Sequence, residues 1–418
     1  MRQAAAGFAV WGCLIGENAL AQTAAPEAPA SAAASERGGA VTAYPPAFFT
    51  EFKAANAFDM VQRLPGFSFN GGADVRGFGG AAGNVLIDGE RPSSKAVPLQ
   101  QILQRIPTSQ VERIDLVRDS ASGIDMQGQS VVANVIRKKG ASATGALQLL
   151  VKPFGDGFVG FVPRIEGSWR SGPLSVEGQL GYRTDRTPNS GEGPISRKTV
   201  SGATLQAGRF KADERQKVVN FNTSAEYRPG VDVLRLNVAG AHEIGARRER
   251  SNLRDALGAF QVFNNSREED YDWEIGGDYE RPLAANLTGR LIALATFATE
   301  DAVGASRGRG QPQRSEESSE GGERILRGEL NGSLGANLRL EAGAEAAFNY
   351  LDSHTAITEG GVPVILPSAN VRVEERRGEA YGTANWRATP ALSVEAGLRY
   401  ERSTISQTGG VDQEKTLS

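Results

Sequence analysis

The stretch of the chain that decides the fold reads Leu338-Arg339-Leu340-Glu341-Ala342-Gly343-Ala344-Glu345-Ala346-Ala347-Phe348-Asn349-Tyr350. Every second residue is aliphatic or aromatic, and polar or small residues fill the positions between. Because successive side chains of a β-strand point to opposite faces of a sheet, this alternation predicts a strand with one apolar face. Residues 174–183 and 393–401 repeat the pattern clearly. Weaker copies occupy residues 163–170, 218–227, 234–240, 273–279, 287–297, 326–334 and 380–388.

Together these segments predict about ten strands of about ten residues, the length that crosses an outer membrane at a tilt. The connections between them alternate in character. Tight turns are expected at Ser171-Gly172-Pro173, Pro229-Gly230 and Gly335. Long polar loops are expected at residues 184–216, 243–271, 299–323 and 352–373. Short turns on one side and long loops on the other are typical of an outer-membrane barrel.

A soluble β-sandwich also alternates polar and apolar residues, but two features of the sequence count against it. The polar face carries full charges such as Glu177, Arg339, Glu345 and Glu395. Aromatic residues also stand at the strand ends, where membrane interfaces favour them. They are Trp169, Tyr182, Tyr227, Tyr279, Tyr350, Trp386 and Tyr400. We therefore expect residues 141–418 to form the N-terminal part of an antiparallel transmembrane β-barrel.

Residues 40–140 have a different pattern, which predicts a small α/β domain. Asn56 can cap a first helix, and apolar residues spaced by three and four from Leu99 to Ile106 predict a second. Strands are expected at residues 85–88, 111–117 and 131–136. The first of these runs into an Asp88-Gly89 turn.

The amino terminus reads as an export signal followed by a flexible leader. A cationic start, an apolar run and the motif Ala19-Leu20-Ala21 predict a signal peptide over residues 1–21. Residues 22–39 are rich in Ala, Pro, Ser and Glu and predict a flexible leader. Ala40-Val41-Thr42-Ala43-Tyr44 then regains β character. Such a segment can add a strand to another protein's sheet or simply begin the fold, and the sequence leaves both open.

Composition excludes several classes of function. The formal net charge is -3, so no global basic field is present to hold nucleic acid. The single cysteine, Cys13, lies in the predicted signal peptide, and the two histidines, His242 and His354, have no carboxylate at ligand spacing. Beyond the signal peptide no apolar run is long enough for a transmembrane helix. We expect no catalytic residue, no metal and no cofactor.

Five ordered segments of the α/β block carry a specific resemblance. They are Phe58-Asp59-Met60-Val61-Gln62-Arg63-Leu64-Pro65-Gly66-Phe67, Val75-Arg76-Gly77-Phe78, Val85-Leu86-Ile87-Asp88-Gly89, Ile106-Pro107 and Val111-Glu112-Arg113-Ile114-Asp115-Leu116-Val117-Arg118. In this order and spacing they resemble the successive signatures of the plug domain of TonB-dependent receptors.

The resemblance implies an outer-membrane receptor whose movable plug fills a wide barrel of about 22 strands. It implies import of a scarce small molecule, such as an iron-siderophore complex, with energy from the inner-membrane TonB complex. Outer-membrane lipid would surround the barrel. The segment Ala40-Val41-Thr42-Ala43-Tyr44 is the candidate contact for the TonB complex. The plug motif positions are Arg76, Gly77, Asp88, Gly89, Glu112, Arg113 and Arg118.

Four of these plug residues, Arg76, Glu112, Arg113 and Arg118, are candidates for ion pairs with inward-facing barrel charges. The alternative places them on the solvated face of the plug sheet. The sequence also departs from the plug pattern, with Asp119-Ser120, Met126-Gln127-Gly128 and Val131-Val132 at positions where the family has Gly-Pro, Tyr-Gly and Gly-Gly. No extra signalling domain fits between Ala21 and Val41.

Energised import is the leading functional hypothesis, with a passive pore or adhesion barrel as the alternative. An exported carbohydrate-active enzyme would need paired carboxylates in a cleft, whereas the acidic residues here alternate along strands or lie in loops. The residues after 140 supply roughly 11 strands, about half of the 22 expected. We therefore expect an incomplete barrel that transports nothing when expressed alone. Deleting residues 40–44 is expected to abolish transport and spare ligand binding.

Overall fold

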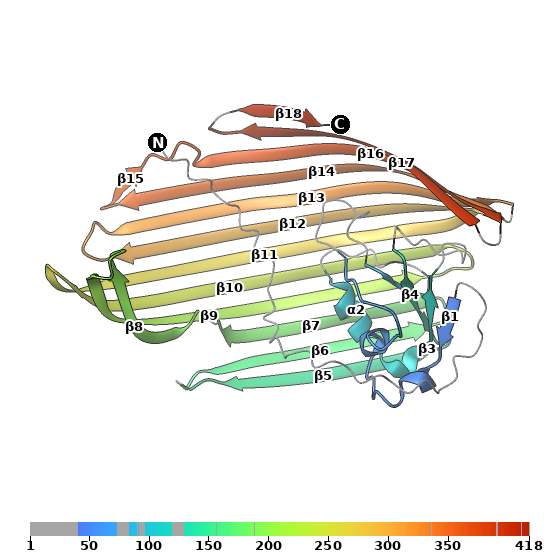
Figure 1. Ribbon diagram of the computed structural model, residues 1–418, viewed down its shortest axis with the longest axis horizontal. Helices are drawn as coiled ribbons and strands as arrows, with labels where there is room; N and C mark the ends of the chain where they lie inside the picture. The colour runs from blue at the N-terminus through green and yellow to red at the C-terminus, as the bar shows by residue number, and fades with distance from the viewer. Residues whose placement is uncertain are drawn as a thin grey trace.

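The computed structural model describes residues 41–72, 83–89, 91, 97–118, 129–155, 157–187, 189–335, 337–389, 392–410 and 412–417. These residues form a small N-terminal domain and a large curved sheet, and the domain lies against one face of that sheet near one end (Figure 1). The predicted signal peptide and leader lie outside the described residues. So do Ala40, Arg76, Gly77, Asp119, Ser120 and Met126-Gln127-Gly128.

The N-terminal domain is built on a four-stranded sheet in the order β1-β3-β4-β2. The strands are β1 (Val41–Tyr44), β2 (Val85–Ile87), β3 (Val111–Val117) and β4 (Val132–Arg137). β3 pairs antiparallel with β1 and β4, and β2 runs parallel to β4. The three strands predicted in this domain are confirmed to within one residue at each end. Residues 41–44 pair with β3 as the first strand of the described fold, and since β1 is an edge strand its contact with another protein stays a prediction.

Two short helices cover this sheet, α1 (Ala57–Val61) and α2 (Leu99–Gln104), with 3-10 turns η1 (Pro46–Phe49) and η2 (Thr108–Gln110). The predicted cap is confirmed, because the Asn56 side chain accepts a hydrogen bond from the Asp59 backbone N–H at 3.0 Å. Met60 of α1 and Leu103 of α2 are buried in one core with Ile106, Phe49 of η1 and Ile114 of β3. Among the described residues, no helix is long and apolar enough to span a bilayer.

The described residues after the N-terminal domain form a single 14-stranded antiparallel sheet. Its strands are β5 (Ser142–Pro153), β6 (Val159–Ser171), β7 (Leu174–Arg186), β8 (Gly191–Lys198), β9 (Thr204–Tyr227), β10 (Val233–Asp255), β11 (Gly258–Ala284), β12 (Leu287–Arg307), β13 (Gln313–Leu334), β14 (Leu338–Glu359), β15 (Val362–Val364), β16 (Asn370–Thr389), β17 (Leu392–Thr408) and β18 (Gln413–Leu417). Neighbours in sequence pair throughout, except that β8 pairs only β9 and β15 only β14. β5 and β18 stand at the two ends, and no pairing between them closes the sheet in the described chain.

The three predicted tight turns are confirmed, because Gly172, Gly230 and Gly335 join neighbouring strands with φ of 54°, 74° and 67°. The four predicted long loops are wrong. β10 and β11 stay paired in register from Val233↔Glu280 to Asp255↔Gly258, so most of the expected loop 243–271 is a hairpin. Charge on both faces suggested a loop, but a strand beyond the membrane is solvated on both faces and still gains by pairing its backbone.

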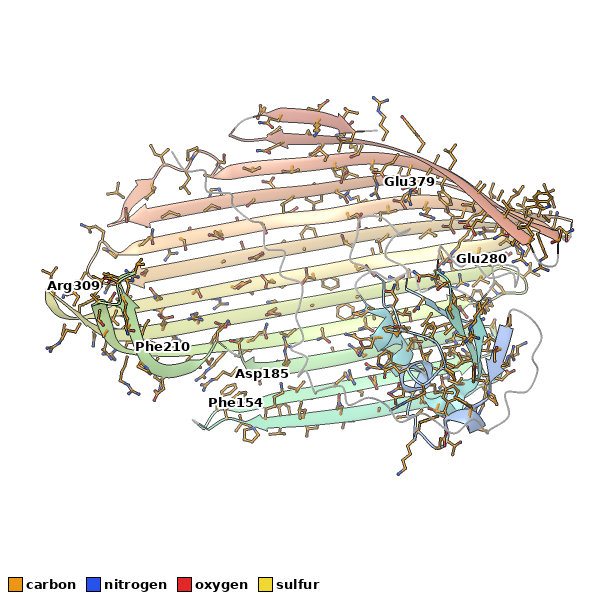
Figure 2. The ribbon with its side chains drawn as sticks, viewed as in Figure 1. Phe154, Asp185, Phe210, Glu280, Arg309 and Glu379 are labelled. Carbon is orange, nitrogen blue, oxygen red and sulfur yellow. The ribbon has the colours of Figure 1, made fainter. Side chains whose placement is uncertain are left out.

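The large sheet is polar on its concave face and apolar on its convex face. The concave face buries charged side chains such as Glu274, Asp278, Arg327 and Glu345, each under 6% exposed. The convex face exposes large apolar ones, including Ile165, Trp169, Leu180, Trp273, Ile275, Leu291, Leu326, Trp386 and Leu398. Figure 2 shows the concave face with the N-terminal domain seated on it. A soluble protein has the opposite arrangement, so the convex face is the one that meets lipid.

Candidate functional site: the interface between the small domain and the sheet

The Asp88-Gly89 turn is fixed by side chains of the neighbouring strand β4. Asp88 has φ of 52° and Gly89 has φ of 90°, the left-handed region that Asp tolerates and Gly favours. The Asp88 carboxylate accepts hydrogen bonds from the Arg137 backbone N–H at 2.8 Å and from Arg137 Nε at 2.6 Å. The Gly89 N–H donates to Asn134 Oδ1 at 2.8 Å. The predicted turn is therefore a rigid element at the edge of the domain.

Arg137 also connects the domain to the large sheet. Its Nη2 lies 3.8 Å from Glu226 Oε1 on β9. Glu226 in turn pairs with Arg228 at 2.8 Å and with Arg235 on β10 at 3.4 Å. One arginine at the end of β4 thus holds a carboxylate of its own domain and faces a carboxylate of the sheet.

The ion pairs continue along the concave face. Arg235 Nη1 lies 2.7 Å from Asp278 Oδ1 on β11, and Arg290 Nε on β12 lies 2.9 Å from the same oxygen. The Asp278 side chain is fully buried. A buried carboxylate is tolerated only with compensating partners, and here two guanidinium groups supply them. The small domain is therefore docked on a network that crosses four strands, β9 to β12.

Hydrogen bonds and apolar contacts add to this docking. Gln110 Nε2 lies 3.3 Å from Thr144 Oγ1 and 3.2 Å from Ser168 Oγ, and Arg170 Nη1 donates to the Lys138 carbonyl at 2.9 Å. Ile102 of α2 packs with Ala239 of β10. Between the two parts lies a cavity of about 120 Å³. Its lining includes Arg91, Glu177, Arg235 and Asn237, so it is polar enough and large enough to hold water.

Of the plug charges predicted to pair with the barrel, Glu112, Arg113 and Arg118 make their contacts within the plug itself among the described residues. Arg113 forms its ion pairs within β3, with Asp115 at 2.9 Å and Glu112 at 2.8 Å. Arg118 is exposed and donates to the Pro65 carbonyl at 3.0 Å. Both side chains are accessible to solvent, so water and partners within the plug satisfy them without a barrel carboxylate. Arg76 lies outside the described residues.

Sequence reasoning missed Arg137 as the docking residue. The available signal was the basic run Arg137-Lys138-Lys139 at the end of the last strand of the domain. A second signal was the alternation itself, which places Glu226, Arg235 and Asp278 on the charged face.

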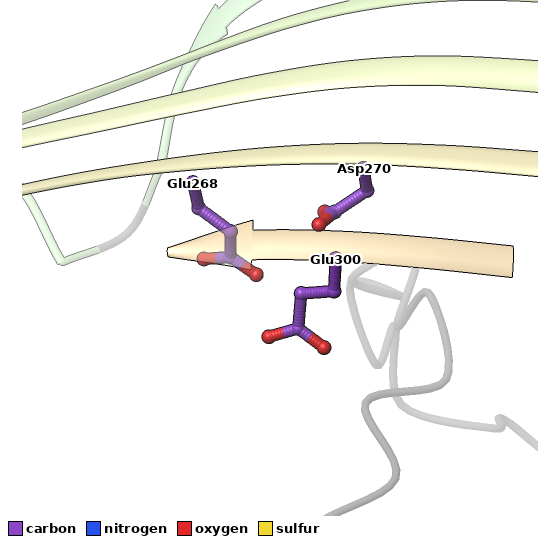
Figure 3. A group of neighbouring side chains, drawn as sticks. All are labelled: Glu268, Asp270 and Glu300. Carbon is purple, nitrogen blue, oxygen red and sulfur yellow. The ribbon is translucent and has the colours of Figure 1, made fainter. Parts of the chain in front are cut away.

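Farther along β11 from the ion-pair network, three carboxylates lie close together on the concave face (Figure 3). Glu268 and Asp270 on β11 and Glu300 on β12 each offer an oxygen within 4.8 Å of the others. They lie outside the membrane-spanning part of β11, whose apolar convex face begins at Trp273. Burial, together with the charges of Glu268 and Glu300, raises the pKa of Asp270 to about 7. At neutral pH the group therefore holds a proton part of the time.

The two histidines take part in no such group. His242 on β10 points to the convex side, where its ring stacks on Tyr271 at 4.1 Å and forms a hydrogen bond with Glu269 at 3.0 Å. His354 lies on β14.

A small mixed domain seated on the charged concave face of an antiparallel sheet, whose convex face is apolar, defines a plugged outer-membrane barrel protein. Two family models match the chain. The TonB-dependent receptor plug domain matches residues 33–131, and the TonB-dependent receptor-like β-barrel matches residues 178–416. The chain belongs to the TonB-dependent receptor family and is a protein of the outer membrane.

Solved structures of the same family are similar to the chain at low sequence identity. The Pseudomonas aeruginosa receptor FpvA, bound to a heterologous pyoverdine and iron, is 15% identical, covers 92% of this chain over 53% of its own, and gives a TM-score of 0.44. The ferric yersiniabactin uptake receptor FyuA from Yersinia pestis is 10% identical, with 88% and 74% covered and a TM-score of 0.33. The chain spans about half the length of FpvA. Comparison with curated proteins gives no match.

Proposed function

We propose that the protein serves as an energised importer, taking up a scarce small molecule such as an iron-siderophore complex across the outer membrane. The observation that carries the proposal is the docking of the described part of the plug, in which polar contacts and the ion pair of Arg137 with Glu226 surround a small apolar contact and a polar cavity. A plug that had to stay in place permanently would be expected to bury a continuous apolar interface. A polar, partly hydrated interface can release and re-form.

We propose further that energy coupling acts through residues 40–44, and the pairing of β1 suggests how. β1 is an edge strand, paired on one side with β3, and Tyr44 is buried against the core. In the proposal the TonB complex grips this strand and peels it from β3. Loss of β1 would uncover Leu116 and Ile114 and loosen the plug.

A reversible crosslink tests this step better than the deletion of residues 40–44, which would also remove Tyr44 from the core. Ala43 and Asp115 are register partners on β1 and β3, and directly opposed residues have the spacing that a disulfide needs. We expect the Ala43→Cys, Asp115→Cys receptor to bind ligand but not import it when oxidised, and to recover on reduction. Ala43→Cys alone is the control. Full uptake by the oxidised receptor would refute peeling of β1.

A passive pore or adhesion barrel is the second candidate function. The two functions differ in their energy requirement. Discharging the inner-membrane proton gradient should abolish uptake by an energised importer and leave diffusion through a pore unchanged. Growth of a deletion strain on a panel of iron chelates, vitamins and oligosaccharides would identify the ligand.

A further inference from the structure

Beyond the membrane, the two faces of strands β9 to β11 carry opposite charge. The convex face is the one that exposes Val219, Tyr271 and Trp273. On β10, His242 is the register partner of both Val219 and Tyr271 and therefore lies on the same face. Because side chains alternate along each strand, residues an even number of positions from Val219 on β9, His242 on β10 or Tyr271 on β11 share that face. The exposed basic residues at such positions include Lys211, Arg215, Lys217, Arg248, Arg250 and Arg267, which we call the basic wall. The concave face of the same strands carries Glu214, Glu243, Glu268 and Asp270.

Pairing register makes the basic wall one continuous surface. Lys211 lies directly opposite Arg250, and Ala246 lies between Arg215 and Arg267 on the neighbouring strands. Adjacent strands are about 4.8 Å apart, so these side chains lie within reach of a single bound headgroup.

The basic wall is only partly neutralised by its own carboxylates. Arg215 pairs with Asp213 at 2.8 Å, Arg267 with Glu269 at 3.1 Å and Lys211 with Glu192 of β8 at 3.5 Å, and the three basic side chains are exposed. Lys217, Arg248 and Arg250 have no ion pair within the part of the chain that the structure describes; Arg250 instead lies over the Phe263 ring at 5.3 Å. Exposed ion pairs are weak and leave the field of the unpaired cations largely intact.

On strands β13 to β16 the convex face carries a second group of charges level with the basic wall, in which basic residues are paired with acidic ones. We call this group the balanced sector. There Arg314 pairs with Glu316 at 2.6 Å, and Arg372 pairs with Glu374 at 2.9 Å and with Asp352 at 3.3 Å. The basic wall is therefore a local feature of β9 to β11 and not a general property of the outer surface.

The basic wall begins where the apolar surface ends. Lys217 is two residues beyond Val219 on β9, a step of about 7 Å along the strand. The stacked pair of His242 and Tyr271 marks the boundary, since aromatic rings with a polar edge settle at the membrane interface. A lipid whose chains lie against Trp273 and Ile275 would hold its headgroup level with Lys217 and Arg248.

We propose that the basic wall binds the phosphate-bearing headgroup of an outer-leaflet lipid. Several arginine and lysine side chains on one face match phosphate oxygens, and the adjoining apolar surface accommodates the chains of the same molecule. A transported ligand is not the occupant, because this surface faces away from the lumen. The proposal rests on membrane placement and is independent of the transport function.

The test uses receptor extracted from outer membranes in mild detergent. The variant Lys217→Gln, Arg248→Gln, Arg250→Gln removes three cations that leave no carboxylate unpaired. The matched control, Arg314→Gln, Arg372→Gln, Arg376→Gln, removes the same charge from the balanced sector. Native mass spectrometry would count retained phospholipid or phosphorylated glycolipid, and thermal denaturation would be followed with added phosphorylated glycolipid, zwitterionic lipid or inorganic phosphate.

We expect wild type and control to retain phosphorylated lipid and the triple variant to retain roughly tenfold less, since each basic side chain near an anionic headgroup strengthens binding several-fold. The conservative variant Lys217→Arg, Arg248→Lys, Arg250→Lys should keep the lipid, which separates loss of charge from misfolding. Only the phosphorylated glycolipid, whose headgroup has a net negative charge, should raise the denaturation temperature. Equal retention by the triple variant and wild type would overturn the proposal. So would equal loss in the control, or equal protection by inorganic phosphate.

Discussion

Arg137 holds Asp88 at two points, through its backbone N–H at 2.8 Å from Oδ1 and through Nε at 2.6 Å from Oδ2. Asp88 begins the turn after β2, and Arg137 is the last residue of β4. The same guanidinium reaches Glu226 of the sheet at 3.8 Å. A single pair of residues therefore stabilises the plug internally and orients the group that docks it.

Replacing Asp88 should weaken both its own contact with Arg137 and the contact of Arg137 with Glu226. We expect Asp88→Ala to lower the stability of the plug by about 2 kcal/mol, because it loses a charged partner, two hydrogen bonds and a residue suited to positive φ. Asp88→Asn keeps the conformation and should cost about half as much. Limited proteolysis of the receptor in detergent would report plug opening. Equal protease resistance of wild type and Asp88→Ala would contradict the role assigned to this pair.

The buried carboxylate of Asp278 should matter far more than an exposed one. Asp278→Asn leaves Arg235 and Arg290 buried without their shared charge, at a cost of about 3 kcal/mol. The control is Asp352→Asn, whose half-exposed side chain pairs with Arg372 and should contribute under about 0.5 kcal/mol. The stability of both variants would be measured as the temperature at which the band of the folded protein disappears when samples are heated before gel electrophoresis. Similar temperatures for the two variants would show that the ion-pair network does not stabilise the large sheet.

Asp270 should make stability depend on pH. Its pKa is raised to about 7 in the folded protein, whereas an unfolded Asp titrates near 3.8. Between these values the folded state binds more protons, so stability falls as pH rises from about 4 to about 7. Asp270→Asn should flatten this slope and gain about 1 kcal/mol at pH 8, after allowing for solvent screening of a partly exposed group. Denaturation temperatures of both proteins across this pH range would check it, and parallel curves would refute it.

Gly343 should resist substitution because a larger residue would displace Tyr381. A Cβ at Gly343 would lie 2.5 Å from the Tyr381 ring. Tyr381 accepts a hydrogen bond from Arg327 Nη2 at 2.6 Å. Gly343→Ala should therefore destabilise the large sheet by about 1–3 kcal/mol.

The matched control for that substitution is Gly328→Ala on the neighbouring strand, where a Cβ would meet nothing within 4 Å. It should be neutral or slightly stabilising, because Ala restricts the unfolded chain more than Gly. Thermal denaturation of the two variants side by side would decide the matter. If the Gly343→Ala receptor were as stable as wild type, the Tyr381 ring would fit in another rotamer and the prediction would be wrong.

The fold could be predicted from the sequence to a large extent because its signals are local. Alternation with a period of two is a property of neighbouring residues, and it identified the sheet and its apolar face, as in residues 338–350. Helix caps and turn residues are local too, and Asn56, Gly172 and Gly230 have the predicted roles. The extent of the strands was not predictable in this way. A charged hairpin such as β10–β11 and a charged loop have the same composition, and only pairing with a neighbour decides between them.

The sequence by itself determined that the chain has a plug, a charged face and a lipid face, since those depend on residue type and spacing. It could not determine which charges meet. Arg113 and Arg137 lie near the same end of the paired strands β3 and β4, yet the first pairs within its own strand and the second reaches Glu226. That choice depends on which side of the plug rests on the sheet and on the register between β9, β10 and β11. Both are long-range properties, because an ion pair needs a separation of about 4 Å that residues 89 positions apart in the chain acquire only when the whole fold has assembled.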